Sequence, residues 1–86
     1  MTQVQSEFKY KQTVILLEDM GNEYRKMLPE RERPKANRFY SVVEKEFDQM
    51  NNEYLYTLKD VETRAVLGVL VSEWQIESIE SYERCS

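Results

Sequence analysis

The chain has no histidine, one cysteine and two glycines, and each shortage removes a class of site. Histidine is the commonest general base near neutral pH and the usual nitrogen ligand of metals. A single thiol, Cys85, forms no internal disulfide and completes no zinc site within one chain. Gly21 and Gly68 stand far apart, so neither belongs to a glycine-rich phosphate loop. We therefore expect a protein that is not an enzyme and that uses no cofactor and no metal.

Long apolar runs are missing from the N-terminal part. Its apolar run, Val14-Ile15-Leu16-Leu17, is shorter than the hydrophobic region of a signal peptide. A membrane-spanning helix needs about 20 apolar residues. We expect one small domain over residues 1–86, in the cytoplasm and without membrane contact.

The composition is that of a folded acidic protein. Hydrophobic residues make up 41% and aromatic residues 12%, which is more than disordered chains carry. The formal net charge is −4. This sign disfavours a general nucleic-acid binder, because such proteins use a surplus of Lys and Arg to displace counterions.

The N-terminal segment has helical spacing. Apolar residues recur at intervals of three and four at Val14, Leu17, Met20, Tyr24 and Met27. This spacing predicts a helix over residues 6–28, ended by Pro29. A strand remains the alternative for residues 6–17, since apolar residues there also alternate.

The clearest helical period follows Pro34, which suits the first turn of a helix. One face collects the apolar side chains Ala36, Phe39, Tyr40, Val43, Phe47 and Met50. The pattern predicts a second helix over residues 34–50, ended by Asn51 and Asn52.

A β-hairpin is expected next, with strands on either side of a polar turn over residues 60–63. In the first strand, Tyr54, Tyr56 and Leu58 share one face. The second strand, over residues 65–71, is apolar on both faces, and Gly68 within it indicates a bulge or a close backbone contact. A lone hairpin is marginal in water, so we expect a homodimer that joins hairpins through Tyr54, Tyr56 and Leu58.

The tail begins with Ser72-Glu73-Trp74-Gln75, which matches a capping-box pattern. It predicts a short helix over residues 73–84, with a strand as the alternative. The expected fold class is therefore α+β: two N-terminal helices packed on an antiparallel β-hairpin, with a short C-terminal helix.

Two charged surfaces are candidate partner-binding sites. Residues 25–38 form a basic patch made of Arg25, Lys26, Arg31, Arg33, Lys35 and Arg38. The tail carries an acidic set made of Glu73, Glu77, Glu80 and Glu83. Solvated surfaces with internal ion pairs are the alternative for both.

These features favour a small acidic protein-binding module, a regulator or inhibitor that acts by occupying the surface of a protein partner. The alternative is a nucleic-acid-binding accessory protein that uses the basic patch. The sequence leaves open the partner's identity, the oligomeric state, and whether the protein is a regulator or an accessory subunit.

Overall fold

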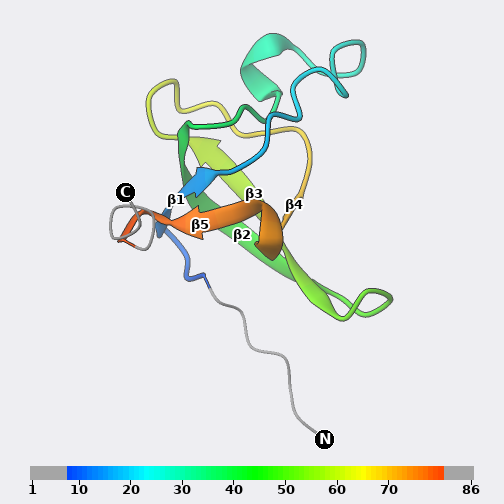
Figure 1. Ribbon diagram of the computed structural model, residues 1–86, viewed down its shortest axis with the longest axis vertical. Coiled ribbons are helices and arrows are strands. Elements are labelled where there is room, and N and C mark those ends of the chain that lie inside the picture. The colour runs from blue at the N-terminus through cyan, green and yellow to red at the C-terminus, as the bar shows by residue number, and fades with distance from the viewer. Residues whose placement is uncertain (1–7, 81–86) are drawn as a thin grey trace, which may run out of the picture.

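The structure is a computed structural model that describes residues 8–80, and it is built around one antiparallel sheet (Figure 1). The five strands are β1 (Thr13–Leu16), β2 (Phe39–Asp48), β3 (Glu53–Asp60), β4 (Val71–Ser72) and β5 (Ile76–Ser78). The two short 3-10 helices are η1 (Glu30–Glu32) and η2 (Glu73–Gln75). In space the strands follow the order β4-β3-β2-β1-β5.

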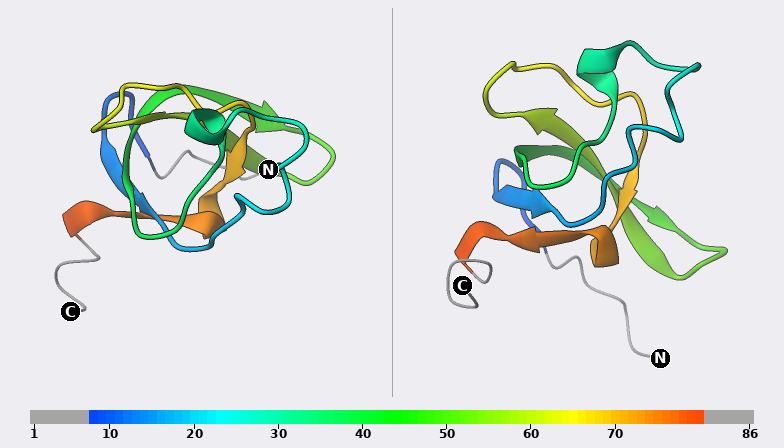
Figure 2. Two further views of the ribbon diagram at one scale, coloured as in Figure 1. Left: turned by 90° about the horizontal axis from the view of Figure 1, so that it is seen from above. Right: turned by 45° about the horizontal axis from the view of Figure 1, so that its top comes forward.

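The sheet is curled until its two edges approach each other. β4 and β5 lie at opposite edges, yet only the three residues of η2 connect them along the chain. So short a connection requires the edges to be close, and Figure 2 shows the strands surrounding a central space. Bringing the edges together protects their unpaired backbone groups, as barrels do.

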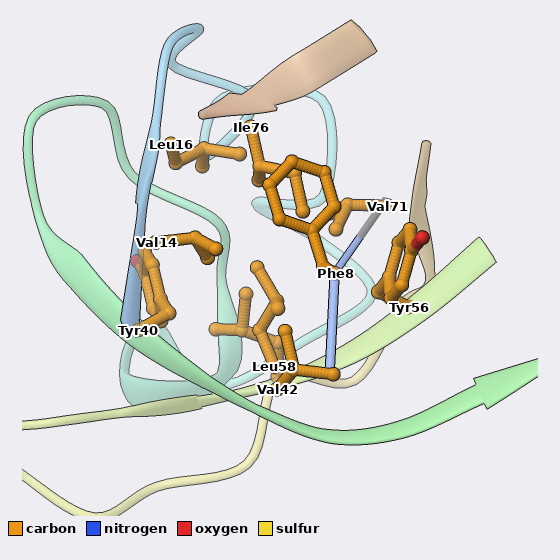
Figure 3. Packing of buried hydrophobic residues seen from close by; sticks show 10 residues of the cluster. Phe8, Val14, Leu16, Tyr40, Val42, Tyr56, Leu58, Val71 and Ile76 are labelled. Atoms are coloured by element: carbon orange, nitrogen blue, oxygen red, sulfur yellow. The ribbon is translucent and has the colours of Figure 1, made fainter. Parts of the chain in front are cut away.

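The core fills that central space. Its largest fully buried side chains include Tyr40, Tyr56, Leu16 and Leu58. Figure 3 shows these side chains pointing inward from β1, β2 and β3, with Phe8 packed edge-on against the ring of Tyr56. Each such side chain contributes about 1.5–3 kcal/mol relative to an exposed position.

The predicted α+β fold is wrong, because the structure has no α-helix of seven or more residues within residues 8–80. The predicted helix over residues 34–50 is mostly β2. A β-bulge between Val42 and Glu44 explains the error. Before the bulge Tyr40 and Val42 point inward, and after it the inward positions begin at Lys45, opposite Tyr56. The one-residue shift breaks the alternation of period two and imitates helical spacing.

The predicted helix is also wrong over residues 8–28, and the strand alternative is correct for β1; residues 6–7 lie outside the described residues. β1 pairs with β2 on one side and with β5 on the other, and its residues Val14, Ile15 and Leu16 are all buried. Consecutive turns replace the rest of the expected helix, over residues 21–27. At its start, the N–H of Gly21 donates to the carboxylate of Asp19 (2.9 Å).

The hairpin prediction is correct for its first strand, β3, and wrong for its second. The antiparallel neighbour of β3 along the chain is β2, through a turn over residues 49–52. The segment 65–70 makes only an isolated bridge, Lys59 to Val66, before β4 begins. Gly68, expected within the second strand at a bulge or a close backbone contact, lies in a bend instead, and a Cβ there would lie 2.5 Å from Leu28 Cδ2.

The tail prediction is right about the capping signature and wrong about a helix over residues 73–78, whereas residues 79–80 are helical. The Gln75 side chain accepts a hydrogen bond from the N–H of Ser72 (2.9 Å), as in a capping box. The helical turn nevertheless ends at Gln75, because Ile76 pairs with Leu16 and begins β5. The final part of the predicted helix, residues 81–84, lies outside the described residues.

Candidate functional site

The β1–β2 connection and the loop after β3 lie at the end of the molecule opposite the tip of the β2–β3 hairpin (Figure 1). Residues of both segments line a basic cleft. Its volume is about 430 Å³. Its lining residues are Pro29, Glu30, Arg31, Arg33, Lys35, Arg38, Tyr40, Asp60 and Thr63. Four are cationic and two are anionic, so the cleft is positive although the whole chain is negative.

The β1–β2 connection is fastened by Tyr40 and Arg33. The ring of Tyr40 is buried, and its hydroxyl accepts a hydrogen bond from the N–H of Lys35 (3.1 Å). Burial raises the pKa of this hydroxyl, so it stays protonated. The guanidinium of Arg33 donates to the carbonyls of Leu28 and Arg25, each at 2.9 Å. Arg33 therefore has a structural role, because it holds together a segment that lacks regular secondary structure.

The floor of the cleft contains an ion pair between Arg38 and Asp60. Both Nε and Nη2 of Arg38 lie 2.8 Å from Asp60 Oδ2. The other carboxylate oxygen accepts hydrogen bonds from the N–H groups of Glu62 (2.8 Å) and Thr63 (3.1 Å).

These contacts keep Asp60 ionised. Burial raises the pKa of Asp60, but the two N–H groups and Arg38 together outweigh burial and leave the pKa lowered. The hydrogen bond to Asp60 raises the pKa of Arg38. Both groups are therefore charged at neutral pH, and they fix the start of the loop after β3.

The cations of the cleft differ in how much charge they present. Lys35 Nζ lies 3.2 Å from the Glu30 carboxylate, and this hydrogen bond lowers the pKa of Glu30. Arg38 is neutralised by Asp60. Arg31 is exposed, and among residues 8–80 no hydrogen bond or ion pair engages its guanidinium. Arg31 is therefore the cation best placed to meet an external anion.

The cleft contains four members of the predicted basic patch: Arg31, Arg33, Lys35 and Arg38. The other two, Arg25 and Lys26, are exposed in the preceding turns and do not line it. The predicted basic patch therefore consists of two separate parts: four residues that line the cleft, and the exposed residues Arg25 and Lys26 outside it.

The predicted acidic set does not form one helical face. Glu73 lies in η2, where it accepts a hydrogen bond from the hydroxyl of Tyr56. Glu77 lies in β5 opposite Ile15, and Glu80 is exposed beyond that strand. Glu83 lies outside the described residues. The helix that would have aligned these carboxylates is not formed over residues 73–78.

The residues expected at a dimer interface lie in or beside the core of a single chain. Tyr56 and Leu58 are fully buried. Tyr54 is partly buried and packs edge-on against Phe47, with ring centroids 5.2 Å apart. Because β3 already pairs with β2 on one side and β4 on the other, it does not need a second copy of the chain to cover its edge, and the homodimer stays a prediction.

Sequence reasoning missed Asp60 and Arg64 as site residues. An Asp that opens a polar turn is typical of side-chain capping, so the turn was a usable signal for Asp60. Its pairing with Arg38, 22 positions away, depends on the tertiary fold. Nothing in the sequence marks Arg64, which reaches the basic region only because its loop folds beside η1.

No family model, curated protein or solved structure matches the chain. Over residues 8–80 there is no cluster of three side chains able to ligate a metal. The same part of the chain contains no helix of the length and apolarity needed to cross a membrane.

Proposed function

We propose that this protein is a protein-binding module, and that its basic cleft receives a carboxylate of an acidic segment on the partner. The observation that carries the proposal is Arg31, whose exposed guanidinium lies at the edge of a positive cleft and pairs with no carboxylate of residues 8–80. The remainder of the chain is net negative, so the cleft stands out in sign from its surroundings. A local positive region of this kind steers acidic partners toward one orientation.

The ion pairs that the cations of the cleft form within the chain favour a carboxylate ligand over a nucleic acid. Lys35 and Arg38 are already paired with Glu30 and Asp60, which leaves few cations for phosphates. Nucleic-acid binding at physiological salt rests on many simultaneous phosphate contacts. Base stacking on Tyr56 is also disfavoured, because its ring is buried.

The proposed mode of action is binding alone. A module that docks through this cleft acts by occupying its partner's surface. Such a protein is a regulator or an inhibitor. A cytoplasmic location remains a prediction from the sequence.

The test uses a fluorescent octaglutamate peptide, with binding followed by anisotropy. An exposed charge pair is worth about 0.2–1 kcal/mol, and reversing the charge adds repulsion of similar size. We therefore expect Arg31→Glu to weaken binding about fivefold, since 1.4 kcal/mol corresponds to about tenfold. Lys26→Glu is the matched control, because it makes the same charge change outside the cleft.

Two results would contradict the proposal. Equal weakening by Arg31→Glu and Lys26→Glu would show that only net charge matters. Tighter binding of a single-stranded DNA oligonucleotide than of the peptide, with a steep loss between about 50 and 200 mM salt, would favour the nucleic-acid alternative.

A further inference from the structure

A second depression continues the basic cleft. It has a volume of about 360 Å³, and its lining residues are Arg31, Glu32, Thr63, Arg64, Ala65 and Val66. Arg31 and Thr63 line both depressions. The two therefore form one groove between η1 and the loop after β3, with Arg31 at its middle and Arg64 on its far side.

The backbone of Arg64 is held in a disfavoured conformation. Its φ is 64°, in the left-handed region that glycine and asparagine adopt most easily. Two backbone hydrogen bonds enforce it: Arg64 N–H donates to the Asp60 carbonyl, and Asp60 N–H donates to the Ala65 carbonyl, both at 2.8 Å. The loop that the Asp60–Arg38 pair anchors thus requires the left-handed residue at position 64.

No polar contact of the Arg64 side chain within residues 8–80 offsets this strain. The side chain is exposed, and over that part of the chain its guanidinium takes part in no hydrogen bond or ion pair. Glycine at this position would suit the backbone better. The structure therefore places an unpaired cation where the fold alone favours a different residue.

We propose that Arg64 is the second anchor of the groove and selects partners with an extended segment that carries two acidic residues. This inference rests on the proposed function, in which Arg31 takes the first carboxylate. The segment would run from Arg31 to Arg64, and Val66, which is 46% exposed, would be available for an apolar contact. Glu32 also lines this part of the groove, so the two carboxylates must lie over the arginines and avoid Glu32.

The test separates stability from binding at one residue. Arg64→Gly removes the cation and relieves the left-handed strain, so we expect the melting temperature to rise by about 3 °C. Its affinity for fluorescent octaglutamate should fall about three- to fivefold. Arg64→Lys keeps the charge and the strain, and should retain most of the affinity.

Lys11→Gly is the matched control, because Lys11 is also an exposed cation with a left-handed backbone (φ 67°) but lies before β1, outside the groove. It should leave affinity unchanged. If Arg64→Gly binds as the wild type while Arg31→Glu binds weakly, the second anchor is refuted and the proposed function stands. If neither variant changes affinity, both proposals fail. A lower melting temperature in Arg64→Gly would assign Arg64 a structural role and overturn this inference.

Discussion

Removing the charge of Asp60 should destabilise the fold far more than removing that of Glu62, although both carboxylates contact Arg38. Asp60 is buried and accepts hydrogen bonds from Arg38, Glu62 N–H and Thr63 N–H. The Glu62 carboxylate lies 3.5 Å from Arg38 Nη2, and its side chain is 82% exposed. The pair of substitutions Asp60→Asn and Glu62→Gln therefore compares a buried and an exposed contact to one guanidinium.

The magnitude follows from the geometry at Asp60. Hydrogen bonds to charged groups contribute about 1.5–3 kcal/mol, and breaking a buried ion pair costs about 3–5 kcal/mol. The Arg38 side chain is 33% exposed and keeps part of its hydration, and asparagine retains one acceptor oxygen. We therefore expect Asp60→Asn to lower the free energy of unfolding by about 2 kcal/mol, which for a domain of this size is a fall of about 10 °C in melting temperature.

Glu62→Gln should change the free energy of unfolding by less than about 0.5 kcal/mol. Thermal and urea unfolding followed by circular dichroism measure both variants. Equal losses for the two, or a loss under about 0.5 kcal/mol for Asp60→Asn, would refute the view that Asp60 anchors the loop after β3.

Two further predictions concern acid and close packing. Because its folded-state pKa is lowered, Asp60 stabilises the fold above about pH 4 and loses this contribution as the pH falls below that value. The stability difference between wild type and Asp60→Asn, measured by urea titration, should therefore be constant near neutrality and shrink in acid; a difference that grows in acid would contradict this. Gly68→Ala should cost about 1 kcal/mol, since the new methyl group meets Leu28 Cδ2. Because only the end of the Leu28 side chain must move, combining Gly68→Ala with Leu28→Ala should cost less than the sum of the two single losses, and strict additivity would rule out the contact.

The sequence predicts local features of this fold better than its class. The capping signature at Ser72, the turn beginning at Asp60 and the strand β3 all depend on a few adjacent residues, and all are found. The class was missed because the bulge after Val42 hides the period of the longest strand. A one-residue irregularity thus turned a strand pattern into a helical one.

The candidate site could be predicted only in part, because the sequence shows which charged residues are neighbours along the chain but not which residues the fold brings together. The basic patch is continuous in sequence, so four of its members could be placed together before the fold was known. Charge counting could not show that Arg33 is used to hold the connection, or that Asp60 neutralises Arg38. It also could not bring Arg64 beside Arg31, since that contact depends on how the loop after β3 packs against η1.

The central claim is that the groove between η1 and the loop after β3 is the binding surface. Titrating isotope-labelled protein with octaglutamate, and following each backbone amide by nuclear magnetic resonance, tests it most directly. We predict saturable shifts confined to residues 29–38 and 60–66, with the turn at residues 49–52 unchanged. Shifts centred on the β2–β3 turn, or small shifts spread evenly over all exposed amides, would contradict the account.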